Sequence, residues 1–334
     1  MQQSALACDN PRPISPFPPL ISLVRYSALL ASRQTRYSFA ASMLGRLPIG
    51  MSGLAILLLV QTTTGSFARG GVATACYVAG LATVAPALGR LIDRYGPRLV
   101  LLVCGLIFPA ALVTLVLAVT RDAPAWLALA FAIAAGASFP PITVCMRAYL
   151  KQRLGDDPLL GTAYSLESVL IETVFIIGPL LVASCVALAS AAVAVLFAAT
   201  CGFFGTLLFL RSPALRTWRI QPRAGAGLLG PLTEPGFVPL IGVIICYSIA
   251  FGMTEIGITA YAAENRHPAL AGVLLGLMSA GSALGGLAYG SRSWGLPLAR
   301  QFAIALGLMG VGLRCLLWAG SHGFLACCAC SRES

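Results

Sequence analysis

Long apolar runs are the feature that most limits what this chain can fold into. Segments such as 98–119 and 161–210 hold twenty or more residues with very few charged side chains. A run of about 20 apolar residues has the length of a helix that crosses the hydrocarbon core of a bilayer. Lipid also leaves backbone groups no outside partner, so only helices and closed barrels can span it. Barrel strands alternate apolar and polar residues, and these runs do not. The sequence therefore predicts an all-α membrane protein.

The overall composition points the same way. Hydrophobic residues make up 58% of the 334 residues and charged residues only 10%, whereas about 25% of residues are charged in soluble domains. A soluble fold of this size would lack polar side chains to cover its surface. The net charge of +11 comes from basic residues scattered between the apolar runs. We therefore expect the lipid bilayer, and no nucleic acid, as the large partner.

The apolar pattern predicts about nine transmembrane helices. Residues 161–210 are too long for one crossing, so we expect two helices there that meet near Ala187–Ala192. The predicted spans are 47–66, 72–92, 98–119, 124–146, two within 161–210, 237–261, 269–290 and 299–319. The predicted domains are a flexible cytoplasmic tail over 1–44, a six-helix half over 45–210, a cytoplasmic linker over 211–235, a partial second half over 236–320 and an irregular tail over 321–334.

Basic residues near the spans gather on one side of this topology. If the N-terminus is cytoplasmic, only Arg69, Arg121 and Arg266 fall near spans on the outer side. Loops rich in Lys and Arg stay in the cytoplasm, so the pattern predicts a multi-pass plasma-membrane protein with a cytoplasmic N-terminus. Six helices, a basic linker and then further helices are also typical of a duplicated six-helix unit.

The loop after the second predicted helix carries a family resemblance. Its sequence runs GRLIDRYGPR, with Gly89, Asp93, Arg94, Gly96 and Arg98 at the matching places. This resembles the signature loop of the major facilitator superfamily, and the resemblance extends over about residues 45–320. It implies a helical bundle that transports by alternating access, with these five residues in a gating loop.

The physics of the loop gives two interpretations. Gly89 has no side chain, so it would let two helices approach closely. Asp93 lies among arginines, and such pairs can form in one conformation and break in another, as a gate requires. The alternative is an ordinary basic cytoplasmic loop with one solvated acid.

A second resemblance lies in the fifth predicted helix. Gly178 and Pro179 are similar to part of a glycine-rich signature that some antiporters of this superfamily carry, but most of the flanking glycines are missing. We therefore expect a helix kink at Pro179, since proline removes a backbone hydrogen bond, and do not carry over antiport.

Three acidic residues fall inside predicted spans. Carboxylates facing lipid are costly, so Glu167, Glu172 and Glu255 should face a cavity or a partner, or else be protonated between helices. Five residues turn a helix by about 140°, so Glu167 and Glu172 do not share a face. Glu172 is the deepest and is the first candidate for proton coupling or substrate contact, followed by Glu255. Glu167 lies nearer the cytoplasm and could instead pair with a basic residue of the loop between the fourth and fifth helices.

The resemblance implies a secondary transporter of a small organic solute, with efflux and proton coupling as further expectations. No ATP-binding loop of the Gly-x4-Gly-Lys-Ser/Thr kind occurs. The only histidines, His267 and His322, are isolated, so we expect no catalytic site, metal or cofactor. The resemblance also implies three more helices than the nine predicted. The alternative function is therefore a truncated, non-transporting remnant or a membrane scaffold.

Overall fold

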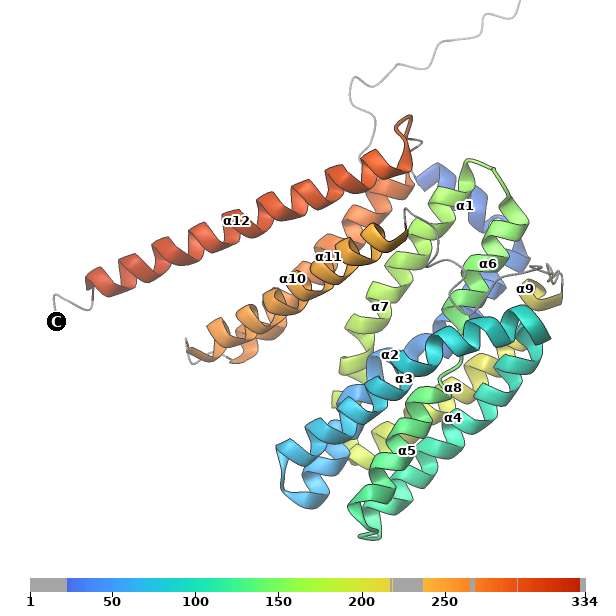
Figure 1. The fold of residues 1–334 in the computed structure, drawn as a ribbon, viewed down its shortest axis with the longest axis vertical. Coiled ribbons are helices and arrows are strands. Elements are labelled where there is room, and N and C mark those ends of the chain that lie inside the picture. Colours follow the sequence, from blue (N-terminus) through green and yellow to red (C-terminus); the bar gives the residue numbers. More distant parts are fainter. Residues whose placement is uncertain (1–22, 217, 219–236, 265–267, 293, 331–334) are drawn as a thin grey trace, which may run out of the picture. The chain divides into compact units, whose positions relative to one another are not determined.

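The computed structural model describes residues 23–216, 218, 237–264, 268–292 and 294–330, and all regular secondary structure within them is α-helical (Figure 1). Residues up to Arg292 form one compact unit, and the segment that follows is a second unit. The helices are α1 (Leu23–Leu30), α2 (Arg33–Thr64), α3 (Phe67–Tyr95), α4 (Pro97–Thr120), α5 (Ala125–Ala137), α6 (Ile142–Leu154), α7 (Leu159–Leu188), α8 (Ala191–Leu210), α9 (Pro213–Arg216), α10 (Phe237–Glu264), α11 (Pro268–Gly290) and α12 (Leu298–Cys330).

The predicted fold class is confirmed. Within the described residues, seven helical segments are long and apolar enough to cross a membrane. The expected split of the run 161–210 falls where it was predicted, since α7 ends at Leu188 and α8 begins at Ala191. The remaining two predicted spans correspond to α11 and α12, which are 23 and 33 residues long.

The predicted tail over 1–44 is wrong from residue 23 onward. Leu23–Leu30 forms α1, and α2 begins at Arg33 instead of near residue 47. The early turns of α2 pack against other helices, with Ser38, Phe39 and Ser42 buried. Burial of these side chains explains why the chain is helical here in spite of its polar residues. Residues 1–22 lie outside the described part of the chain.

The fourth predicted span is two helices in the structure. α5 ends at Ala137 and α6 begins at Ile142. Pro140 and Pro141 lie in the break, and proline cannot donate the backbone hydrogen bond that a continuous helix needs. Phe139 lies in the same break, and its ring packs edge-on against that of Phe108, with ring centroids 5.4 Å apart.

The structure also bears on two other predicted irregular segments, the tail over 321–334 and the linker over 211–235. The tail over 321–334 is wrong as far as Cys330, because α12 continues to that residue. No proline occurs between Leu298 and Cys330 to stop the helix. In the linker, α9 occupies Pro213–Arg216, and residues 219–235 lie outside the description.

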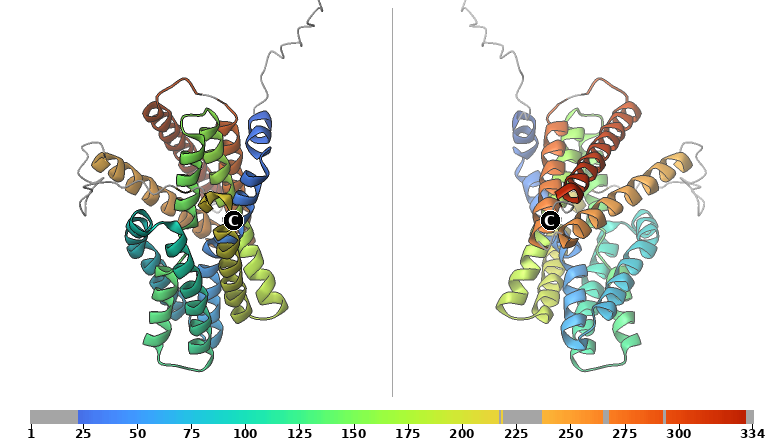
Figure 2. Two further views of the ribbon diagram at one scale, coloured as in Figure 1. Left: turned by 90° about the vertical axis from the view of Figure 1, so that its right-hand side faces the viewer. Right: turned by 90° about the vertical axis from the view of Figure 1, so that its left-hand side faces the viewer.

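Helix α2 is central to the first unit and packs against α3, α7 and α8. Figure 2 shows α2 in blue between α3 on one side and α7 and α8 on the other. Glycines make the closest of these approaches: a side chain on Gly205 of α8 would collide with the backbone of Gly45. Glycine has no side chain, so two helices can pack backbone to backbone at such points. These contacts fix where α2 carries its polar side chains relative to α7.

Candidate functional site

Three helices bring charged side chains together inside the bundle. Arg46 on α2 donates a hydrogen bond from Nη2 to Oε1 of Glu167 on α7 at 2.7 Å. Arg147 on α6 places its Nε 3.6 Å from Oε2 of the same carboxylate. We call Arg46, Arg147 and Glu167 the charge cluster.

The charge cluster is largely shielded. The side chain of Glu167 is 0% exposed and that of Arg46 is 3% exposed, whereas the side chain of Arg147 is 52% exposed. Three polar atoms of the cluster have no hydrogen-bond partner among the described residues: Nε and Nη1 of Arg46, and Oε2 of Glu167. Removing charges from water costs several kcal/mol per ion unless each is paired and hydrogen-bonded. The cluster is therefore only partly compensated.

The sequence predicted that Glu167 could pair with a basic residue of the loop between the fourth and fifth helices. It did not predict the closer partner, Arg46. Arg147, near the loop between the fourth and fifth predicted helices, is within ion-pair distance of Glu167. Arg46, however, precedes the predicted first span, which begins at residue 47, and so lies outside the membrane in that prediction. Because α2 begins at Arg33, Arg46 is well inside the helix. A buried glutamate that needs a cation was the signal that could have found it.

Glu172 has a different environment from Glu167. Its partly exposed carboxylate accepts a hydrogen bond from the hydroxyl of Ser282 on α11, with 3.0 Å between Ser282 Oγ and Glu172 Oε1. The two glutamates of α7 therefore face different helices. Glu255 is on α10, and its side chain lies outside the described part of the structure.

The signature loop does not make the close contact expected of it. A side chain on Gly89 would meet no heavy atom within 4 Å, so the predicted helix approach is wrong for this structure. Asp93 is exposed, and none of the ion pairs found within the described residues includes it. The guanidinium of Arg94 instead lies 5.3 Å from the ring centre of Tyr95.

The turn that follows explains the second glycine of this loop. Gly96 separates α3 from α4 with a φ of 81° and donates its N–H to the carbonyl of Ile92. Residues with side chains rarely adopt that backbone conformation. Arg98 follows in the first turn of α4 and is exposed. Gly96 therefore has a structural role here, and a gating role for Asp93 stays a prediction.

Gly178 marks a close approach of two helices. A side chain on it would lie 2.6 Å from the carbonyl carbon of Gly50 on α2. Pro179 follows inside α7, which is helical as far as Leu188. The kink expected at Pro179 stays a prediction, and the contact between Gly178 and Gly50 is what the sequence did not reveal.

Two hydroxyl groups hold the last turn of α11. Tyr26 on α1 donates to the carbonyl oxygen of Leu287 at 2.8 Å. Thr162 on α7 donates to the carbonyl oxygen of Gly290 at 2.6 Å. Ser165 lies so close to Gly290 that any side chain there would collide with it. Burial raises the pKa of Tyr26 above its ordinary value of 10.0. Sequence reasoning gave no role to these residues.

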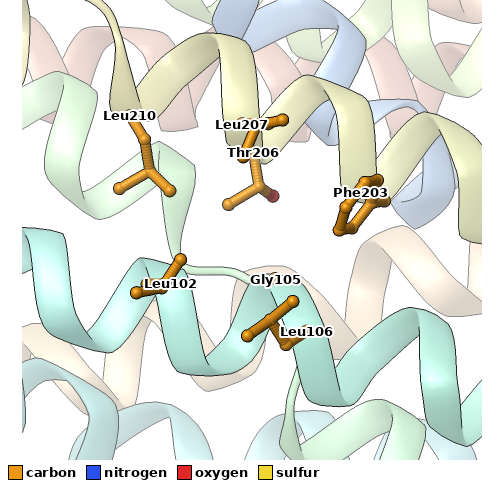
Figure 3. A pocket seen from close by; sticks show the side chains of 7 residues that line it. All are labelled: Leu102, Gly105, Leu106, Phe203, Thr206, Leu207 and Leu210. Atoms are coloured by element: carbon orange, nitrogen blue, oxygen red, sulfur yellow. The ribbon is translucent and has the colours of Figure 1, made fainter.

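A small apolar groove lies between α4 and α8 (Figure 3). Its volume is about 10 Å³, which is about that of one water-sized sphere. The lining residues are Leu102, Gly105, Leu106, Phe203, Thr206, Leu207 and Leu210. The groove is too small to hold an organic solute, so it is not a candidate transport site.

One comparison with known proteins matches most of this chain. A family model described as Major Facilitator Superfamily matches residues 38–331, which include every residue of the charge cluster and of the signature loop. Searches of curated proteins and of solved structures found no match.

Proposed function

The chain belongs to the major facilitator superfamily, and from this premise we propose that it carries a small organic solute across the plasma membrane by proton-coupled alternating access. The coarse function follows from the family, whose members are membrane secondary transporters. The solute class, proton coupling, the outward direction of transport, the plasma membrane and a cytoplasmic N-terminus are the proposed parts. The distribution of arginines between the two sides supports the orientation.

The hydrogen bond between Glu172 and Ser282 is the observation that carries proton coupling. It joins α7, which belongs to the predicted first half, to α11, which belongs to the predicted second half. Alternating access requires the halves of such a transporter to move against each other. A carboxylate at their contact changes its hydrogen bonding when it gains a proton, because only the ionised form is a pure acceptor. Protonation of Glu172 would thereby alter a contact between moving parts.

A non-transporting scaffold is the second candidate, and one helix favours it. The most apolar stretch of α10, Phe237–Thr254, has none of its residues buried within the structure. Such a helix could contact a helix of another chain as well as lipid. Gradient-driven flux would decide between the two functions, since a scaffold requires none.

The test is flux in vesicles that contain the purified chain. A panel of radiolabelled organic solutes is offered with and without an imposed pH gradient, for the native chain and for Glu172→Gln. We expect the gradient to drive uptake of at least one solute in the native chain. Glu172→Gln should still move that solute down its own gradient but should no longer respond to the pH gradient, because the amide cannot take up a proton.

The matched control is Asp156→Asn, which neutralises a fully exposed acid whose partner is Lys151. It should keep the pH response of the native chain. Proton coupling through Glu172 would be refuted if Glu172→Gln responded to the gradient as the native chain does. Absence of flux for every solute, from protein shown to be folded, would favour the scaffold.

A further inference from the structure

We propose that Arg46 binds the carboxylate of a small organic anion and that Glu167 occupies this binding group when the anion is absent. The inference rests on the proposed function, because it names the chemical class of the solute. It assigns a role to the charge cluster that is separate from the contact between Glu172 and Ser282.

The charge balance of the cluster calls for a further anion. Two guanidinium groups, from Arg46 and Arg147, surround the single carboxylate of Glu167. Arginine stays protonated in proteins, so the cluster carries an excess positive charge. Within the described residues no other acidic side chain forms an ion pair with either arginine. A monoanionic ligand would make the cluster neutral.

Arg46 also has donors to spare. Only its Nη2 bonds to Glu167, while Nε and Nη1 have no partner among the described residues. The Arg46 residue is 2% exposed, so these N–H groups are removed from solvent as well. A guanidinium binds a carboxylate best through two parallel N–H donors. Nη2 together with either unpartnered nitrogen provides such a pair once Glu167 moves away.

Arg147 gives Glu167 another place to go. Its Nε is already 3.6 Å from Oε2 of Glu167, an oxygen that accepts no hydrogen bond within the described residues. A small rotation of the carboxylate would therefore exchange Arg46 for Arg147. After the exchange each arginine has one carboxylate, so binding separates no charges. Half of the Arg147 side chain is exposed, which places the open edge of the cluster on its side.

Ligand binding to the purified full chain in detergent tests this inference. The probes are benzoate and its uncharged analogue benzamide, and the readout is the shift of the unfolding temperature with probe concentration. We expect benzoate to raise this temperature and benzamide to leave it unchanged. Arg46→Lys should weaken benzoate binding by about tenfold or more, because lysine cannot form the two parallel bonds. The control Arg36→Gln alters an exposed arginine of the same helix and should have no effect.

Glu167→Gln gives the sharpest result, because a purely structural ion pair predicts the opposite. It removes the competitor for Arg46, and a hydrogen bond between charged groups contributes enough that benzoate should bind about tenfold to a hundredfold more tightly. Arg147→Gln should weaken benzoate binding, since Glu167 would lose its second partner. The inference is overturned if benzamide acts like benzoate, if Arg46→Lys behaves like Arg36→Gln, or if Glu167→Gln weakens benzoate binding.

Binding and flux separate this inference from the transport proposal. Transport of an uncharged solute by a chain that does not bind benzoate would refute only the role of Arg46. Binding of benzoate with the expected pattern of variants, by a chain that moves no solute, would refute only transport.

Discussion

Replacing Gly178 by alanine tests whether backbone contact between α2 and α7 stabilises the first unit. The added carbon would lie 2.6, 2.7 and 2.9 Å from the carbonyl carbon, oxygen and Cα of Gly50. Carbon atoms in ordinary contact are about 3.5–4.0 Å apart, so the helices would have to separate by about 1 Å. Rotation of a side chain cannot relieve the clash, because the atoms that Gly178 meets belong to the backbone of α2.

The expected magnitude follows from comparison with Gly89→Ala. Both glycines are inside helices, so both variants gain the same helix propensity, about 1 kcal/mol. Only Gly178→Ala also suffers overpacking, which costs about 1–3 kcal/mol, because a side chain on Gly89 meets nothing within 4 Å. The free energies of unfolding of the two variants should therefore differ by about 1–3 kcal/mol, with Gly89→Ala the more stable.

Equilibrium unfolding in mixed micelles with a denaturing detergent measures this difference. The native chain and both variants are compared under one set of conditions, with helix content followed by circular dichroism. Equal unfolding free energies for the two variants would refute the reasoning. So would a loss of stability in Gly89→Ala as large as in Gly178→Ala.

Three further variants test other contacts. Arg46→Leu should lower the free energy of unfolding by about 3 kcal/mol, because it leaves Glu167 buried with only its longer ion pair to Arg147. Adding Glu167→Leu should restore most of that loss. A double variant less stable than Arg46→Leu alone would contradict this reasoning. Tyr26→Phe should cost about 1 kcal/mol below pH 10. Since burial raises the pKa of Tyr26, this contribution is present below the pKa of the unfolded chain and is lost as the pH rises through the folded value; a pH titration of unfolding should therefore show a drop that Tyr26→Phe lacks. Asp93→Asn should change the unfolding free energy by less than about 0.5 kcal/mol, as is usual for exposed sites, while flux falls; flux equal to that of the native chain would remove the gating role.

The spans could be predicted because lipid imposes simple rules. Apolar length alone located the boundary between α7 and α8. The same rule failed for the start of α2, since hydropathy detects contact with lipid and not contact with other helices. Ser38 and Ser42 are polar and yet fully buried. The break between α5 and α6 was missed, because 124–146 was predicted as one span although Pro140 and Pro141 interrupt it.

The candidate site was predictable only in part. Helix geometry alone separated Glu167 from Glu172, and the structure gives them partners on different helices. The partners themselves, Arg46 and Ser282, come from segments 121 and 110 residues away in the chain. Which helices meet depends on packing at glycines such as Gly178, and a single sequence does not specify which glycine faces which helix.

The hydroxyl groups of Tyr26 and Thr162 hold α11 by its main-chain oxygens. Every amino acid supplies the same carbonyl oxygen, so the attachment does not depend on which residue occupies position 287. Position 290 is the exception, because Ser165 leaves no room for a side chain. A different side chain at position 287 would therefore keep the hydrogen bond from Tyr26, whereas any side chain at position 290 would disturb the attachment of α11 to α7.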